Sequence, residues 1–535
     1  MKAHLLFKDK DFFPDATLRP NANVVIQDLE MTTLFDAMAL GDEFLYRVAQ
    51  NGIMASLNDV AAILYRQDIL RDCMKNPSVV RELYALAVEA IEDGKKHYFG
   101  SYLRAGSILY TAIDLLEVFL GMLKKLRAIA ETNASIFSSE GFRMLFSMLK
   151  SELDDEYFYT IQNHLEELKF RHGVQVSAGL DKVNKGVNYV LRKLEIRKRR
   201  LVQRIFEKKP PEYSFQVAER DVAGGQALSE LREKGINLVA SALAQSTEHI
   251  RHFFTMLKTE LAFYVGCLNL YEQLVGIGEA TCFAAPAPAS ERAYSARKLY
   301  DVCLALTKKK VIIPNDVNAD CKDLIIITGA NEGGKSTFLR SIGLAQAMMQ
   351  SGMFVPADSL RASICEGLFT HFRRKEDVTM TSGKLDEELS RMSDIVDIIT
   401  PDSVVMFNES FSATNEREGS EIARHIVDAL LERRIKVFFV THFFEFSRNF
   451  FERHLPNALF LRPERKGDGA RTFKIVENAP QETSFGDDLY RAVFDGSRSS
   501  RRGEREKWDG RGAGAKSAEY TNQSLTGRES VPKDP

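Results

Sequence analysis

The chain has 535 residues, which is enough for two or three domains. Hydrophobic residues make up 44% and charged residues 27%, an ordinary balance for a soluble globular protein. The formal net charge of -2 excludes a polycation, so any surface that binds nucleic acid must be a local patch. The six cysteines form no C-x-x-C pair, which argues against a zinc site or a disulfide framework and fits a reducing cytosol.

The charges near the N-terminus argue against a signal peptide. Lys8, Asp9, Lys10 and Asp11 fall where such a peptide would need an apolar run. We also expect no apolar stretch long enough to span a bilayer. Together these expectations predict a cytoplasmic protein without a membrane partner.

The first 280 or so residues have the pattern of helices. Apolar residues recur at three- and four-residue steps from Leu109 to Leu123, which indicates one buried helical face. A longer pattern from Ile250 to Val275 has a period of 3.5 residues. It predicts either a helix packed in an ordinary bundle or an extended lever or coiled coil, and the pattern leaves both open.

A basic stretch interrupts the helical pattern. Gly173–Leu180 alternates enough to predict a short strand. Lys182–Lys209 follows, is rich in Lys and Arg, and ends at two prolines. One interpretation is a surface that contacts phosphates; the other, more usual for a charge run, is a solvated helix face. The residues at the centre of the first interpretation are Arg197, Lys198, Arg199 and Arg200.

The Ala/Pro-rich segment Cys282–Ser290 marks a predicted domain junction. After it, short apolar runs at 324–328, 404–407 and 437–440 are typical of buried parallel strands, and 416–433 of a crossover helix. From Ser497 the chain has almost no aliphatic residues and is predicted to be disordered. We therefore expect a helical domain at 1–280, an α/β domain at 281–496 and a tail at 497–535.

A phosphate-binding motif follows the first of these strands. Gly329–Ser336 (GANEGGKS) fits G-x-x-x-x-G-K-[ST], and an amphipathic helix is predicted at 337–349. The glycines let backbone N–H groups converge on phosphate oxygens, and the helix N-terminus adds partial positive charge. Lys335 would reach the β- and γ-phosphates, and the Ser336 hydroxyl would ligate Mg²⁺. The motif predicts ATP and Mg²⁺ as cofactors.

Two further strand ends carry polar residues in the order that such a site requires. The apolar strand 404–407 ends in Asn408 and Glu409, which would lie beside Mg²⁺ and the γ-phosphate. Glu409 is the candidate base that orients the attacking water. Asn408 stands where an Asp usually holds the Mg²⁺ shell, so metal binding should be weaker. His442 follows the third strand and either senses the γ-phosphate or is a structural residue.

These motifs resemble those of the MutS family of DNA-repair proteins. Ile327–Thr337 is similar to the MutS phosphate loop, and Thr441–Phe443 to its switch after the third strand. Ile312–Asp316 resembles the segment that lies against the adenine, with only an aliphatic contact from Ile312. Ser351–Ala357 resembles the segment after the loop's helix. The resemblance implies that ATP contacts Ile312, Gly329, Asn331, Gly333, Gly334, Lys335, Ser336 and Thr337.

The sequence departs from the family's pattern at two loops. Ser410–Gly419 has lost most of the glycines that the family has after Asp-Glu. Thr381–Leu389 lacks the usual Ser-Thr-Phe, and Ser382 with Gly383 resembles the Ser-Gly of ABC-type signatures instead. In the family this segment reaches the partner's γ-phosphate, so the resemblance implies a homodimer with composite ATP sites.

The helical half resembles the family less closely. Ile26–Leu34 is similar to the start of the MutS core, Ile250–Val275 to its lever helix, and residues 165–215 to a shortened clamp. The resemblance implies an N-terminal all-α core and lever domain followed by an α/β P-loop NTPase domain. It also implies a truncated form that lacks the mismatch-recognition and connector domains.

The sequence leaves three hypotheses for function. The first is an ATPase that couples ATP in a dimer to DNA binding in repair or recombination, without reading mismatches directly. The second is an ATP-gated protein-interaction switch with little hydrolysis and no nucleic-acid role. The third is an ATP binder that hardly hydrolyses, because of Asn408 and the altered signature.

Overall fold

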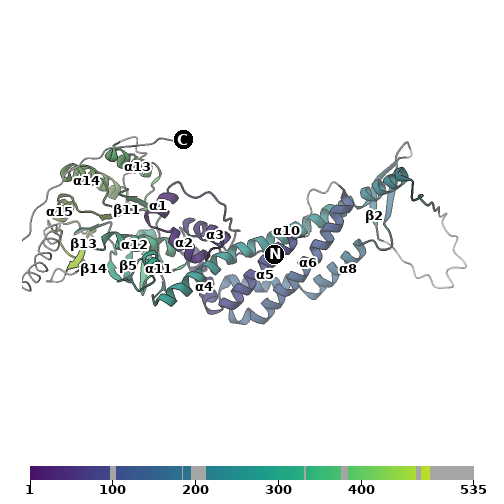
Figure 1. The fold of residues 1–535 in the computed structure, drawn as a ribbon, viewed down its shortest axis with the longest axis horizontal. Coiled ribbons are helices and arrows are strands. Elements are labelled where there is room, and N and C mark those ends of the chain that lie inside the picture. Colours follow the sequence, from purple (N-terminus) through teal and green to yellow (C-terminus); the bar gives the residue numbers. More distant parts are fainter. Residues whose placement is uncertain are drawn as a thin grey trace, which may run out of the picture.

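A computed structural model describes residues 1–96, 104–183, 185–193, 213–329, 333–374, 383–465 and 471–481. The described chain is elongated, with a helical half and a half that mixes strands and helices (Figure 1). One 56-residue helix, α10 (Val222–Ile277), runs along the helical half and ends against the other half. At 1.5 Å per residue it is about 84 Å long.

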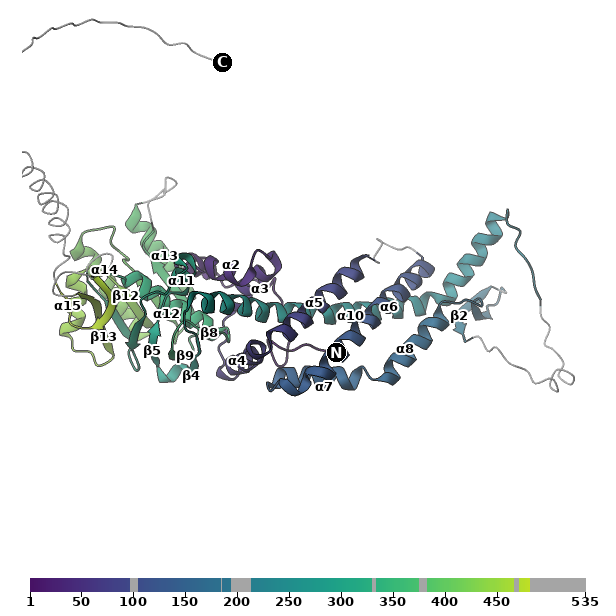
Figure 2. The same cartoon turned by 60° about the horizontal axis from the view of Figure 1, so that its bottom comes forward.

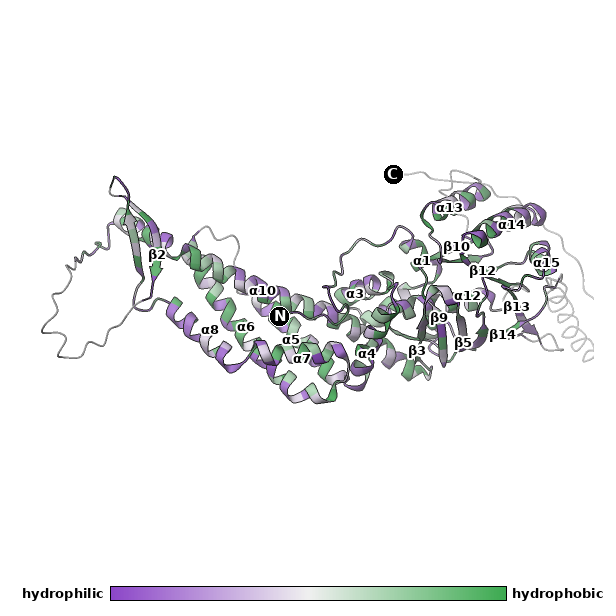
Figure 3. Ribbon diagram, turned by 180° about the vertical axis from the view of Figure 1, so that it is seen from behind, coloured by the Kyte–Doolittle hydropathy of each residue, from purple (hydrophilic) through white to green (hydrophobic). Residues whose placement is uncertain are grey.

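The helical half packs shorter helices around α10 (Figure 2). Those that precede it are α1 (Ala22–Asp28), α2 (Thr32–Ala39), α3 (Glu43–Met54), α4 (Val60–Lys75), α5 (Pro77–Lys96), α6 (Ala105–Asn133), the 3-10 turn η1 (Ala134–Ile136), α7 (Glu140–Glu152) and α8 (Asp155–Leu168). Figure 3 shows hydrophobic and hydrophilic residues alternating along α6, α7 and α8, as in amphipathic helices.

Local signals fix both ends of α10. The Asp221 carboxylate accepts a hydrogen bond from the Gly224 N–H at the N-terminus, and Gly278 ends the helix at φ 89°. The 3.5-residue pattern lies where α10 is buried against α2, α3, α5 and α6, while Leu238 further out is 77% exposed. The helix is therefore packed in a bundle over the patterned part and also extends beyond it.

Helix α6 corrects one expectation from the sequence. Among the described residues, Ala105–Ile136 is long and apolar enough to cross a membrane, with a mean hydropathy of 1.6. Half of that apolar window is buried, because α6 packs against α5 and α10 and Phe119 lies on Phe254 at 6.0 Å between ring centroids. A buried core helix passes the same test of length, so the segment is weak evidence for a membrane.

The basic stretch begins as a strand and not as a helix face. Its strand β2 (Gly186–Arg192) pairs antiparallel with β1 (Gln175–Leu180), which matches the strand predicted there. The Asp181 carboxylate accepts hydrogen bonds from the N–H groups of Val183 and Lys185 and so holds the turn. The run of Arg197, Lys198, Arg199 and Arg200 lies outside the described residues.

The other half is built on a six-stranded sheet in the order β10-β11-β12-β7-β13-β14. Its strands are β7 (Leu324–Ile327), β10 (Leu368–Phe372), β11 (Val404–Asn408), β12 (Lys436–Val440), β13 (Ala458–Arg465) and β14 (Arg471–Glu477). The helices of this half are α11 (Val302–Lys308), α12 (Lys335–Gln350), α13 (Lys384–Ile398), α14 (Glu416–Glu432) and α15 (Phe444–Glu452).

Smaller sheets join this half to the helices. A four-stranded sheet has the order β4-β9-β5-β6, and β3 pairs with β8. Their bounds are β3 (Cys282–Phe283), β4 (Ala285–Ala287), β5 (Tyr294–Leu299), β6 (Asn315–Asn318), β8 (Phe354–Val355) and β9 (Ser359–Ser363), with the 3-10 turn η2 (Ala289–Glu291) between β4 and β5.

The three strands predicted from apolar runs are β7, β11 and β12, and they are buried almost throughout. The predicted crossover helix is α14, which differs only at its last residue. Strands β10, β11, β12, β7 and β13 are parallel to one another, while β14 is antiparallel. A parallel sheet needs cover on both faces, which explains why these strands are continuously apolar.

Candidate nucleotide-binding site

The candidate site lies at the carboxyl ends of three neighbouring parallel strands. In the register of the sheet, Asn408 of β11 is opposite Val440 of β12, and Val440 is opposite Ile327 of β7. The segments that follow these strands therefore leave the sheet at one edge. That edge is where open α/β sheets bind ligands.

The phosphate loop has the backbone that its glycines were expected to provide. Gly329 has φ 119° and Gly334 has φ 89°, values that residues with a Cβ rarely adopt. A Cβ on Gly329 would also lie 3.0 Å from Pro463. Helix α12 starts at Lys335, two residues before the predicted start, so its N-terminal N–H groups face the loop. Gly333 is buried beside Gly334, and Asn331 lies outside the described residues.

Lys335 is held inside the loop. Its side chain is buried, with 4% exposed, and Nζ donates a hydrogen bond of 2.7 Å to the Gly329 carbonyl oxygen. Burial lowers the pKa of Lys335, and the negative charge of Glu409 opposes that shift. The charges of Lys335 and Glu409 therefore interact, as expected for two residues that were both predicted to lie near the γ-phosphate.

Ser336 and Asn408 meet directly. The Ser336 Oγ donates a hydrogen bond of 2.8 Å to the Asn408 Oδ1. The two residues predicted to hold Mg²⁺ come from different elements, α12 and β11, yet they present their oxygens to the same point. Hydroxyl and amide oxygens are hard ligands suited to Mg²⁺, although this pair carries no negative charge of its own.

Glu409 and His442 occupy the turns after β11 and β12. Glu409 has φ 53°, and its N–H donates a 2.9 Å hydrogen bond to the Val440 carbonyl oxygen. Such a conformation is uncommon for a residue with a side chain, and the bond to β12 holds it. His442 is exposed, and its ring lies edge-on to Phe443 at 4.9 Å between centroids. Its exposure leaves the ring accessible to a ligand, as sensing a phosphate would require.

A cavity of about 390 Å³ adjoins the phosphate loop. Gly334 and Thr337 line it at the loop, and Ile312 and Phe473 line it as apolar walls. The other lining residues are Leu299, Tyr300, Asp301, Leu304, Lys308, Lys310, Val311, Ile313, Asn315, Phe338 and Ser341. Ile312, which was expected to contact the base, thus lines a cavity next to the phosphate loop.

Sequence reasoning missed Phe473 and Tyr300. Phe473 of β14 is 43% exposed, and its carbonyl oxygen accepts a 3.2 Å hydrogen bond from Asn315 Nδ2. The cavity thus has the aromatic wall that the segment around Ile312 lacks. Tyr300 is buried, and its hydroxyl has no hydrogen-bond partner among the described residues. Neither residue belongs to a motif that the sequence analysis used.

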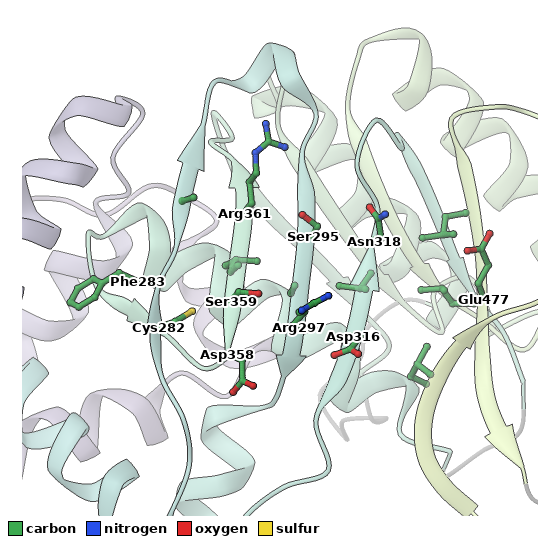
Figure 4. Close-up of a pocket in the computed structure, with 17 residues that line it drawn as sticks. Cys282, Phe283, Ser295, Arg297, Asp316, Asn318, Asp358, Ser359, Arg361 and Glu477 are labelled. Carbon is green, nitrogen blue, oxygen red and sulfur yellow. The ribbon is translucent and has the colours of Figure 1, made fainter.

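The structure describes one of the two candidate residues from the signature segment. Gly383 is the N-cap of α13 and does not line the cavity, and Ser382 lies outside the described residues. A second cavity of about 740 Å³ opens over β5, β6 and β9 and carries Arg297 and Arg361 (Figure 4). Within the described part of the chain, none of the residues that line this second cavity belongs to the phosphate loop.

The residues fit a nucleoside triphosphate with Mg²⁺. The loop has the backbone for phosphates, and the adjoining cavity has apolar walls for a base. The orphan hydroxyl of Tyr300 is a buried polar atom that a ligand in the cavity could satisfy. Lys335, Ser336 and Asn408 are the residues that would hold the phosphates and the metal.

Two family models match the chain. The MutS2 N-terminal domain matches residues 58–277, which run from just before α4 to the end of α10. MutS domain V matches residues 325–493, which begin in β7 and include α12, β11 and β12. The two matches thus cover most of both halves of the chain. The chain belongs to the MutS family.

Three similar proteins are each named DNA mismatch repair protein MutS. That of Leptospira interrogans (strain Fiocruz L1-130) is 33% identical over 178 residues, which are 30% of this chain and 21% of that protein. That of Thermotoga sp. (strain RQ2) is 33% identical over 178 residues, 32% of this chain and 22% of that protein. That of Streptococcus thermophilus (strain LMD-9) is 26% identical over 276 residues, 51% of this chain and 32% of that protein.

This MutS-family chain therefore aligns with a third or less of the length of those relatives. The part of the chain that contains the candidate site lies within the match to MutS domain V.

Proposed function

We propose that this MutS-family protein is an ATPase that acts in DNA repair or recombination. ATP binding and hydrolysis in a homodimer would be coupled to its grip on DNA. The observation that carries the proposal is the hydrogen bond between Ser336 and Asn408 at the phosphate loop, beside a cavity of about 390 Å³ with apolar walls. Domain V membership supports the same activity.

The residues divide the chemical work. Lys335 and the N-terminus of α12 would bind the phosphates, and Ser336 and Asn408 would hold Mg²⁺. When bound, the metal neutralises charge that develops on the phosphates. Glu409 would orient the attacking water, and the favourable effect of its charge on the Lys335 ammonium supports a place at this site. His442, exposed at the next strand end, would sense the γ-phosphate.

DNA binding would be led by charge and shape and not by reading a mismatched base. The end of α10 distant from the candidate site carries the β1–β2 hairpin, with Lys182, Lys185, Arg192 and Lys193 exposed on it. Lys193 forms an ion pair with Glu167 and Arg192 donates to Ser177, so the first two lysines are the more accessible. Basic groups at the tip of a long lever suit contacts with a phosphate backbone.

The test is ATP hydrolysis by the full chain with no DNA, single-stranded DNA, duplex DNA and branched DNA, each at two salt concentrations. We expect DNA to change the turnover rate and the affinity for DNA to fall steeply with salt, since each neutralised phosphate releases counterions. Binding that is insensitive to salt, or no DNA binding at all, would refute the DNA role. ATP binding would stand or fall independently in the same assay.

The alternative is an ATP-gated protein-interaction switch, which the near-neutral net charge favours. Reversing the charges of Arg197, Lys198, Arg199 and Arg200 to Glu discriminates between the two. Lost DNA binding with intact ATP binding supports the first function. Unchanged behaviour supports the switch.

A further inference from the structure

The C-terminal end of α12, the helix that starts at the phosphate loop, is hydrogen-bonded to the helical half of the chain. At its last residues the Gln350 carbonyl oxygen accepts a 2.7 Å hydrogen bond from the Leu57 N–H. The Ser351 carbonyl oxygen accepts a 3.2 Å hydrogen bond from Arg66 Nη1. Carbonyls at a helix C-terminus have no partner within the helix, so these donors from α4 and the turn before it satisfy them.

Arg66 is an unusual residue for a protein interior. Its side chain is 0% exposed, and burial lowers its pKa to about 10, so the guanidinium stays charged at neutral pH. A cation is favoured at the C-terminal end of a helix by the helix dipole. Helix α12 therefore has a phosphate site at one end and a buried cation at the other. The fit is tight, since a Cβ on Gly352 would lie 2.4 Å from the Arg66 Cβ.

Arg66 also binds the first residues of the chain. We call residues 1–13 the N-terminal strap; the chain begins within the helical half (Figure 1), and the strap contacts α10 at Tyr264. Arg66 Nε donates a 2.7 Å hydrogen bond to the Leu6 carbonyl oxygen. Leu5 and Leu6 are fully buried, so the strap is enclosed at this point.

The other side of the strap is bound to α10. The N–H groups of Leu5 and Leu6 both donate to Glu260 Oε2. The Tyr264 hydroxyl donates a 2.6 Å hydrogen bond to the Leu5 carbonyl oxygen. Glu260 and Tyr264 are four residues apart and so lie on one face of the helix. Hydrogen bonds thus connect the end of α12 to α10 without a break.

This network has unused hydrogen-bonding capacity. Among the described residues, Arg66 Nη2 and Glu260 Oε1 are buried without a hydrogen-bond partner. Buried polar groups are nearly always satisfied, so a pair of orphans in one network needs an explanation. A spare donor and a spare acceptor allow the network to exchange partners, which a device with two arrangements requires.

We propose that Ser351, Arg66, the strap at Leu5 and Leu6, Glu260 and Tyr264 form a relay that transmits the nucleotide state to α10. The relay rests on the proposed ATP binding. Phosphates bound at the N-terminus of α12 shift or stiffen this helix. Its C-terminal carbonyl groups then displace Arg66, which is hydrogen-bonded to the strap. The strap in turn transmits the displacement to α10. Arg66 is a positioning residue, since it touches no nucleotide atom.

The test measures amide hydrogen exchange in the full chain, with and without Mg²⁺ and a non-hydrolysable ATP analogue. The reporter is the distal part of α10, residues 222–240. Two variants remove single relay groups: Tyr264→Phe removes a donor, and Glu260→Met removes the acceptor of the Leu5 and Leu6 N–H groups. The control is Tyr294→Phe, which removes a hydroxyl that donates 3.1 Å to the Ile342 carbonyl oxygen of the same α12 but does not touch the strap.

In the native chain and in the control we expect nucleotide to change exchange at the reporter by about fivefold. In the two relay variants we expect that change to fall below about twofold, while nucleotide affinity stays within about twofold of native. Comparing the melting temperatures of Tyr264→Phe and Tyr294→Phe shows whether a general loss of stability accounts for the difference in exchange.

The outcomes separate the relay from the function on which it rests. If the native chain binds no nucleotide, the proposed ATPase fails and the relay with it. If nucleotide binds but exchange at the reporter stays constant in the native chain, the relay alone is overturned. A native-sized response in Tyr264→Phe and Glu260→Met, or an equal loss in Tyr294→Phe, overturns it too.

Discussion

The Ser336 hydroxyl and the Asn408 amide oxygen are 2.8 Å apart, although 72 residues separate them in the chain. The bond joins the phosphate loop to the second strand of the site and defines the point at which a metal would lie. An amide at this point supplies an oxygen but no charge, whereas a carboxylate would supply both. The strength of Mg²⁺ binding should therefore depend on this one residue.

We expect Asn408→Asp to raise the apparent affinity for Mg²⁺ in the presence of ATP by about tenfold, because a negative charge would act on the cation at short range. A magnesium titration of nucleotide binding measures it. Asn449→Asp is the control, since it adds the same charge at an exposed position of α15. Equal Mg²⁺ affinities for native and Asn408→Asp would remove Asn408 from the metal site.

Lys335→Met should weaken ATP binding by about 100-fold or more, because it removes the buried cation that the phosphates require. Lys150→Met provides the control at an exposed lysine of α7. Calorimetric titration with ATP and Mg²⁺ measures both variants. If Lys335→Met binds ATP as tightly as the native chain does, the loop is not a phosphate site.

Glu409→Gln should lower kcat about 100-fold while leaving the affinity for ATP nearly unchanged, because the amide retains the shape but cannot act as a base. Steady-state turnover and equilibrium binding, measured side by side, separate the two effects. Matching rates for native and variant would mean that Glu409 orients no water here and would favour an ATP binder that hardly hydrolyses.

Phe473→Ala should weaken ATP binding about tenfold, because the cavity beside the loop loses its aromatic wall. Ile312→Ala should act in the same direction, by less. Inorganic triphosphate serves as the internal control, since it has no base and its affinity should stay constant. A variant that weakens ATP and triphosphate equally would place the base elsewhere.

His371 should make the protein less stable in mild acid. Burial, helped by the charge of Arg391, lowers the pKa of His371 to about 4 from an ordinary 6.5. As pH falls below 6.5 the unfolded chain takes up a proton that the folded chain refuses, so stability is lost between about pH 6.5 and 4. At pH 5 this loss is roughly 2 kcal/mol relative to pH 7.

Urea unfolding of the native chain and of His371→Gln at pH 7 and pH 5 measures this loss of stability. The variant should lose less stability on acidification than the native chain does. The control His425→Gln, at an exposed histidine of α14, should lose as much stability on acidification as the native chain does. A native-like pH dependence in His371→Gln would contradict the assignment. Protonation of His371 should also affect the candidate nucleotide site, because His371 Nδ1 lies 2.8 Å from the Oγ of Ser410, the residue after Glu409.

Some expectations from the sequence were wrong because local pattern does not record packing. The sequence left two interpretations for the stretch from Lys182, a surface of phosphate contacts or a solvated helix face. Its described part contains β2, paired with β1, so the helix face is wrong there, while the phosphate contacts stay a prediction. The sequence of this stretch shows both charge and alternation, and pairing with β1 is what makes it a strand. The expectation that no apolar stretch is long enough to span a bilayer was also wrong, since α6 is. Its apolar residues pack against α5 and α10.

The sequence by itself determined the local parts of this protein: the strands β7, β11 and β12, the phosphate loop and the residues at three strand ends. Each has a local cause, such as an apolar run covered on both faces or a glycine with positive φ. The tertiary structure alone decided that Phe473 completes the cavity with Ile312, and that Leu6 reaches Glu260. Such contacts join distant segments, and neither periodicity nor motif spacing encodes them.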